Sequence, residues 1–269
     1  DSFSFTIIAS SQHEYSMDTV KSIIAVAGAA ILYYLCTIGF LRIVIFKTKV
    51  EQHEKVVLLN TAVFANTGFV GFPLMLSLFG NKGLLLASIY NLMYNLFFYT
   101  YGATLYSNRK GEIKQILFNP VSIASIGAIA LFIVPWRMPA FVLDTINIVG
   151  NMTVPLSMII LGSTLATIDV KKLFTDIKSY IITALRLIVF PLLMMVAIVI
   201  VRKFVWVSPE TAITLVLMTA LPCGTMNVIY AEKYNCAPKF AARTVVMSLF
   251  LMSITLPIML FLSTYLFMV

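Results

Sequence analysis

The sequence predicts an all-α polytopic membrane protein, and three observations support that prediction. Of its 269 residues, 60% are hydrophobic and 11% are charged, whereas a soluble domain carries about 25% charged residues. Apolar stretches long enough to cross a bilayer as helices, about 20 residues each, recur along the whole chain. The segments between them are short and hold most of the basic residues. These connections leave no room for a soluble domain.

The first half of the chain contains four candidate spans after a polar opening. Residues 1–17 are mixed in character, and we expect an outer loop or an interfacial segment there. An apolar run over residues 18–46 follows, long enough to cross the membrane at a tilt. Two more runs, 55–79 and 83–106, are separated by a short polar gap, and a fourth covers 116–135.

The second half contains four further spans of the same kind. Residues 140–168 form a long apolar run with several polar side chains, and residues 177–201 form a more uniformly apolar one. The last two spans cover 209–231 and 240–268. Eight spans are therefore expected in this chain.

The basic residues predict how the spans are oriented. Thirteen of the 19 Lys and Arg residues lie in every second gap: Arg42, Lys47, Lys49, Lys55, Arg109, Lys110, Lys114, Lys171, Lys172, Lys178, Lys233, Lys239 and Arg243. Short basic loops stay on the cytoplasmic side of a membrane. Both ends of this chain are therefore expected to face outward. The net charge of +8 is explained by topology, and we expect no binding of nucleic acid.

Two of the spans contain helix-breaking residues near their centres. The stretch "FANTGFVGFPLM", residues 64–75, and the stretch "TALPCGTMNVIYAEKYN", residues 219–235, each combine Pro with Gly, Thr and Asn. An interior proline costs a helix about 3 kcal/mol or more, and backbone groups freed in the bilayer survive only beside protein or a water-filled cavity. The residues that define the two breaks are Asn66, Thr67, Gly71 and Pro73, and Pro222, Gly224, Thr225 and Asn227.

The two breaks lie five spans apart, so their helices run in opposite directions and form an inverted pair. One break alone would be explained as readily by a packing kink as by a site. Paired interruptions in two inverted halves are typical of a secondary transporter's binding site. The amino ends of the broken half-helices favour anions, and neutral amides are cheaper to desolvate than charges each time a substrate leaves.

The motifs resemble those of the auxin efflux carrier family, which includes PIN-like carriers and bacterial organic-acid permeases. The matching stretches are "ANTGFVGFPLM" (65–75), "NPVSIASIGAI" (119–129), "PLSMIILGSTLA" (155–166), "LRLIVFPLL" (185–193) and "ALPCGTMNVIYAEKYN" (220–235). The resemblance implies ten spans in two inverted five-helix repeats whose two broken helices cross beside the substrate. It also implies transport-unit helices in 18–106 and 169–269 and scaffold helices in 107–168, with two further spans before this chain.

From these observations we predict a secondary active transporter for small organic anions, mono- or dicarboxylates, that works by alternating access. A channel or a non-transporting membrane receptor on the same fold is the alternative. The expected partners are the anion, a coupling H+ or Na+, the lipid bilayer of a plasma membrane, in bacteria the inner membrane, and a second copy in a homodimer. We expect no cofactor, no bound metal and no enzymatic activity, because no catalytic motif is present.

Four further residues are candidates for substrate contact or gating. Arg186 is the only charge well inside a span, and intramembrane charges are rare and often functional. It could equally reach toward the basic flank of its span. Asn91 and Asn95 share one helix face, and Asn151 lies among other polar residues of its span. For these three, hydrogen bonding between helices is the competing interpretation.

Overall fold

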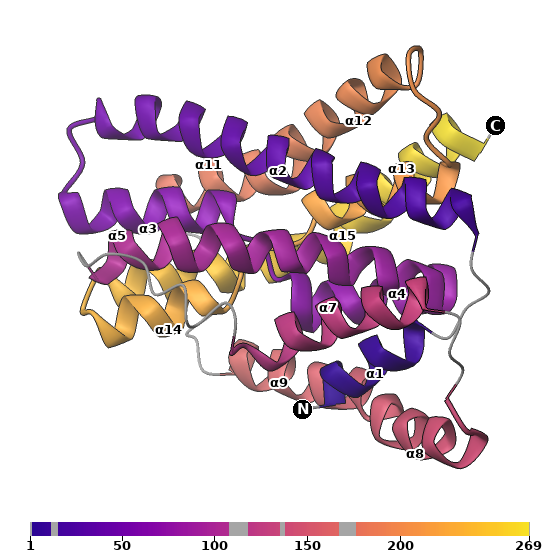
Figure 1. The fold of residues 1–269 in the computed structure, drawn as a ribbon. Helices are drawn as coiled ribbons and strands as arrows, with labels where there is room; N and C mark the ends of the chain where they lie inside the picture. The colour runs from indigo at the N-terminus through magenta and orange to yellow at the C-terminus, as the bar shows by residue number, and fades with distance from the viewer. Residues whose placement is uncertain (1, 12–15, 108–117, 135–137, 167–175, 269) are drawn as a thin grey trace.

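The computed structural model describes residues 2–11, 16–107, 118–134, 138–166 and 176–268. These residues form helices joined by short turns, and no strand occurs among them (Figure 1). The all-α class predicted from the sequence is confirmed. Here α marks α-helices and η marks wider turns of π-helix.

The described residues of the first half of the chain form eight helical segments. In order they are α1 (Ser2–Ser10), α2 (Met17–Phe46), α3 (Gln52–Val63), η1 (Thr67–Gly71), α4 (Phe72–Phe97), η2 (Phe98–Gly102), α5 (Ala103–Ser107) and α7 (Pro120–Ile133). The segments η1, α4, η2 and α5 follow one another without a gap and form one long helical path, Thr67–Ser107. That path is interrupted once, at Gly80, whose φ of 59° and ψ of −148° are not helical. Such a positive φ is readily adopted only by glycine.

In the second half, too, eight helical segments occur among the residues that the structure describes. They are α8 (Ala140–Asn151), α9 (Thr153–Ala166), α11 (Ile177–Ala184), η3 (Leu185–Val189), α12 (Phe190–Val201), α13 (Pro209–Thr219), α14 (Met226–Lys233) and α15 (Pro238–Met268). The segments α11, η3 and α12 together form one continuous helix over Ile177–Val201.

Within the described ranges, five helical stretches are long and apolar enough to cross a membrane. They are Met17–Phe46, Thr67–Ser107, Ala140–Ile160, Ile177–Val201 and Pro238–Met268. Helix α7 is apolar but has only 14 residues, and the interrupted pair α13 and α14 has only 11 and 8. A polytopic membrane protein follows from these helices, while the number of eight spans stays a prediction.

Residues 2–10 differ from the loop expected over 1–17, because they form helix α1. This helix packs against α7 and α8, and Ile7 on it is fully buried. Its Thr6 hydroxyl donates to the carbonyl of Gly150 at 3.1 Å and lies 2.8 Å from the hydroxyl of Thr153. A segment rich in Ser, Thr and β-branched residues has weak intrinsic helix propensity. Tertiary packing supplies the stability that the local sequence lacks.

Two of the basic connections lie at the same end of the helix bundle, while Arg109, Lys110, Lys114, Lys171 and Lys172 lie outside the described residues. The turn from α2 to α3 and the end of α14 lie at that end, while α12 and α15 finish at the opposite one (Figure 1). Lys47 and Lys49 belong to the first of these connections, and Lys233 ends α14. This arrangement agrees with the alternation of charge along the sequence. The orientation in a membrane remains a prediction.

Candidate functional site

The two predicted helix breaks meet at one point in the middle of the bundle. Ala65 and Cys223 face each other as an isolated antiparallel β-bridge. The N–H of Asn66 donates to the carbonyl of Pro222 at 2.9 Å, and the N–H of Gly224 donates to the carbonyl of Phe64 at 2.9 Å. Backbone groups that would otherwise be unsatisfied in the bilayer are thus paired with each other. We call residues 64–66 and 220–225 with these bonds the crossing.

The first break is shaped by the end of α3 and by the wide turn that follows. Helix α3 ends at Val63, and Phe64 is extended, with φ −98° and ψ 110°. The π-helical turn η1 then precedes Pro73, which stands in the first turn of α4. A proline cannot donate a backbone hydrogen bond and is tolerated best in the first turn of a helix. Pro73 therefore shapes the restart of the helix, on the far side of η1 from the crossing.

The second break is held by Asn227, which is fully buried. Its side-chain Nδ2 donates to the carbonyl of Phe64 at 3.2 Å and to that of Gly224 at 3.0 Å. One amide group therefore binds both breaks. Gly71 in the first break lets the two breaks pack closely, because a Cβ at this position would lie only 2.9 Å from Cδ1 of Leu221 in the second break.

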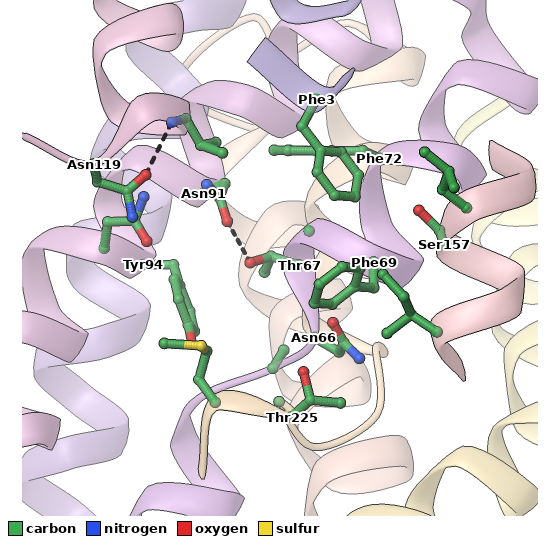
Figure 2. A pocket seen from close by; sticks show the side chains of 18 of the residues that line it. Phe3, Asn66, Thr67, Phe69, Phe72, Asn91, Tyr94, Asn119, Ser157 and Thr225 are labelled. Carbon is green, nitrogen blue, oxygen red and sulfur yellow. Dashed lines mark hydrogen bonds between the residues drawn. The ribbon is translucent and has the colours of Figure 1, made fainter. Parts of the chain in front are cut away.

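A cavity of about 530 Å³ opens beside the crossing. Its walls come from both breaks, from α4, from the start of α7, from α9 and from Phe3 of α1 (Figure 2). None of the described residues that line it is charged. Six residues predicted from the sequence line it: Asn66, Thr67, Gly224, Thr225, Asn91 and Asn95.

The polar end of the cavity lies at the amino ends of two half-helices. Residues 66–68 precede and open the helix that continues as α4, and residues 224–226 do the same for α14. The first N–H groups of a helix have no partner within it and carry partial positive charge. Asn66, Thr67 and Thr225 lie together there (Figure 2). The Nδ2 of Asn66 is buried and has no hydrogen-bond partner among the described residues.

Asparagine amides line the wall between α4 and α7. Asn91 accepts a hydrogen bond from the Thr67 hydroxyl at 2.6 Å, and Asn95 donates to the Ser122 hydroxyl at 2.9 Å. Asn119 accepts from the N–H of Val121 and donates to the Tyr99 hydroxyl at 3.3 Å. Asn95 and Asn119 therefore use their side-chain amides in hydrogen bonds between helices, which is the alternative to a direct contact with substrate.

Opposite these amides the cavity wall is mainly apolar, with Ser157 as its polar member. Phe3 packs edge-on against Phe69 and Phe72, with ring centroids 5.5 and 5.6 Å apart. Leu156 and Ile160 of α9 complete this wall. Sequence reasoning missed Phe3, because residues 1–17 read as a loop. It also missed Asn119, although an Asn-Pro pair at the start of an apolar run is a signal for a helix cap.

Several predicted site residues lie outside the cavity. Pro222 contributes its carbonyl to the crossing, and Asn151 is exposed at the end of α8. Arg186 is fully buried but does not line the cavity. In the described part of the chain no group of His, Cys, Asp or Glu side chains is placed to hold a metal ion.

The crossing predicts a specific cross-link. Ala65 and Cys223 form the pair that lies between two backbone hydrogen bonds, where Cα atoms are about 4.5 Å apart, a separation that a disulfide can span. We expect Ala65→Cys, made with Cys36→Ser and Cys236→Ser, to oxidise to an intramolecular disulfide with Cys223. Mass spectrometry of unreduced peptides would detect it. Adding Cys223→Ser must abolish the product, and two free thiols after oxidation would contradict the crossing.

The sequence of this chain is similar to those of known membrane transport proteins. A family model described as "Membrane transport protein" matches residues 4–117 and 113–260. An uncharacterized transporter of Methanothermobacter thermautotrophicus is 28% identical over 200 residues, which cover 73% of this chain and 64% of that protein. An uncharacterized transporter of Methanocaldococcus jannaschii is 33% identical over 132 residues, covering 45% and 42%. The matched part of this chain thus spans less than two thirds of either relative.

Proposed function

This chain belongs to the membrane transport protein family, and from that premise we propose that it carries small organic anions, mono- or dicarboxylates, across a cell membrane by alternating access. One observation carries the proposal. The amino ends of two interrupted helices border one cavity with no charged side chain among its described lining residues, and so does the Nδ2 of Asn66, which has no hydrogen-bond partner within the described ranges. Helix amino ends stabilise negative charge by about 0.3–1 kcal/mol each at exposed sites and by up to about 2 kcal/mol when partly buried. A carboxylate would find several N–H donors there.

The neutral lining supports transport rather than permanent binding. A lysine or arginine in the cavity would hold a carboxylate strongly and resist its release. Amide and hydroxyl groups such as those of Asn66, Thr67 and Thr225 still bind a charged partner with about 1.5–3 kcal/mol per hydrogen bond. The aromatic and aliphatic wall formed by Phe3, Phe69 and Leu156 and its neighbours would receive the carbon skeleton of the anion.

We also propose which parts move, following the transport-unit and scaffold division that the family resemblance implies. We assign α2–α5 and α11–α15 to a transport unit that contains the whole crossing, and α7–α9 to a scaffold. Helix α1 packs against α7 and α8, so we add it to the scaffold. The cavity lies where the two units face each other, and the bond from Asn95 on α4 to Ser122 on α7 joins them. In this scheme the crossing moves as one body past the scaffold, exposing the anion to one side and then the other.

Binding and transport can be tested separately with the full-length protein. We expect a subset of carboxylates to raise its melting temperature in a saturable manner, because a ligand that binds only the folded state stabilises it. In proteoliposomes the same anions should show counterflow, in which unlabelled substrate inside accelerates entry of labelled substrate. Binding without counterflow would indicate a receptor, and flux without trans-stimulation would indicate a channel. The absence of any stabilising anion would contradict the proposed site.

A further inference from the structure

At each break one half-helix finishes with a carboxyl end and the next begins with an amino end, and these ends carry partial charges of opposite sign. The cavity is bordered by the amino ends. Its lining includes residues 66–68 and 224–226, which are the amino ends of the second half-helices. The carboxyl ends of the first half-helices, α3 at Val63 and α13 at Thr219, lie on the other side of the crossing. A helix carboxyl end carries about half an elementary negative charge on its unsatisfied carbonyls. Two such ends brought together represent about one negative charge in a buried place.

Arg186 is in direct contact with the carboxyl end of α3 and with the break that follows the carboxyl end of α13. Its Nη1 donates to the carbonyl of Val63 at 2.9 Å and is 3.4 Å from that of Ala62, both in the last turn of α3. Its Nε donates to the carbonyl of Leu221, just beyond α13, at 3.0 Å. The hydroxyl of Tyr33 accepts a further bond from Nη1 at 2.6 Å. One guanidinium thus joins α2, α3 and the second break.

No acidic side chain of the described residues pairs with this buried charge. The ion pairs in these ranges join Lys21 to Asp18, Lys82 to Glu210 and Lys178 to Glu54. Arg186 is nevertheless fully buried, and a buried charge without compensation is strongly unfavourable. The carbonyls of the two breaks are therefore its counter-charge, together with the ring of Tyr33, whose centroid lies 6.0 Å from Cζ.

We propose that Arg186 is the positioning residue of the crossing, and that its guanidinium occupies the place where a bound cation would otherwise compensate the carboxyl ends of both interrupted helices. A guanidinium is permanently charged and presents a rigid fork of donors. It can therefore hold two separate carbonyl groups in a fixed relation. It does not touch the cavity and so is not the direct partner of a substrate anion.

The proposal has two physical consequences. First, the crossing needs no metal cation for its integrity, since the single positive charge of Arg186 matches the two partial charges. Second, with the carboxyl ends neutralised, the amino ends dominate the potential in the cavity. This second consequence rests on the proposed function, because it concerns affinity for a transported anion.

The first test uses the unmodified full-length protein and no substrate. Melting temperatures are compared in sodium, potassium, lithium and choline chloride at equal ionic strength. We expect the same value in all four salts. A saturable rise with one alkali cation, absent with choline, would show that a bound cation stabilises the native state and would overturn the proposal.

The second test compares two arginines of the same transmembrane helix. Arg186→Met removes the buried cation, and Arg202→Met removes an exposed one beyond the end of α12. We expect Arg186→Met to lower the melting temperature by about 10 °C or to prevent recovery of folded protein, and Arg202→Met to change it by less than about 2 °C. If Arg186→Met cannot be recovered as folded protein, the melting temperature of Arg186→Lys is the deciding measurement, because lysine lacks the planar set of donors that holds two carbonyl groups at once. A melting temperature equal to that of the wild type in the deciding variant would overturn the proposal.

The third test separates positioning from mere stability. Well below the melting temperature, Arg186→Met should weaken binding of a stabilising carboxylate by about tenfold, and Arg186→Lys should restore part of that loss because it keeps the charge. Unchanged affinity in a folded Arg186→Met protein would overturn the electrostatic role. If no carboxylate binds the wild type, the proposed function fails, while the salt comparison and the stability comparison still decide on Arg186.

Discussion

Replacing Asn66 with aspartate is expected to abolish carboxylate binding and transport while the protein still folds. Asn66 is 4% exposed and its Nδ2 lacks a partner among the described residues, so no intramolecular side-chain bond of that atom is lost. An aspartate there would place a negative charge beside the incoming carboxylate, and such like-charge contacts cost several kcal/mol. Binding by thermal shift and counterflow in proteoliposomes would measure the effect.

The alanine variant of the same residue provides a graded comparison. Asn66→Ala removes one hydrogen bond to a charged group, about 1.5–3 kcal/mol, so affinity should fall by roughly 10- to 100-fold. Asn151→Ala is the matched control, because Asn151 is exposed on α8 and outside the cavity. It should bind and transport like the wild type. Wild-type affinity in both Asn66 variants would remove Asn66 from the site.

Replacing Gly224 with alanine is expected to force the two breaks apart. A Cβ at this position would lie 2.9 Å from the carbonyl oxygen of Ala65 and 3.1 Å from that of Phe64. These are backbone atoms and cannot rotate away, and the Phe64 oxygen also accepts bonds from Gly224 and Asn227. Overpacking of a close contact costs about 1–3 kcal/mol, and lost hydrogen bonds add to it. The melting temperature should fall by about 5–10 °C.

Gly68→Ala is the control for this substitution. Gly68 belongs to the other break and lines the same cavity, yet a Cβ there would meet no atom within 4 Å. We expect its melting temperature to stay within about 2 °C of the wild type. Equal stability of the Gly224 and Gly68 variants would mean that the breaks are not in close contact.

The position of the crossing could be predicted from the sequence because its cause is local. Pro222 and the Gly and Asn residues of both breaks disfavour a continuous helix, and nothing in a bilayer compensates the freed backbone except another part of the protein. Pro73 marks the first break in the sequence but is accommodated in the first turn of α4. The offset of five spans from one break to the other predicts that their helices run in opposite directions. In the structure the two breaks meet at the bridge between Ala65 and Cys223, while their inverted relation stays a prediction.

The division of roles within each break could not be predicted. Asn66 and Asn227 look alike in sequence, yet the first leaves a donor beside the cavity and the second bonds the backbone of both breaks. Arg186 is a comparable case. A charge inside a span can face a substrate, the interface or a buried carbonyl, and its contact with Leu221 and Val63 depends on three helices far apart in the chain.

The sequence by itself determined the class, the membrane character and the presence of two interrupted helices, because these follow from composition, apolar runs and the backbone chemistry of proline and glycine. Only the tertiary structure decided which polar groups face the cavity, which hold the crossing together, and that Phe3 in α1 belongs to the wall. Hydropathy and helix breaking are local properties. The partner of a polar side chain in the bilayer is set by the packing of distant helices, which no single stretch of sequence contains.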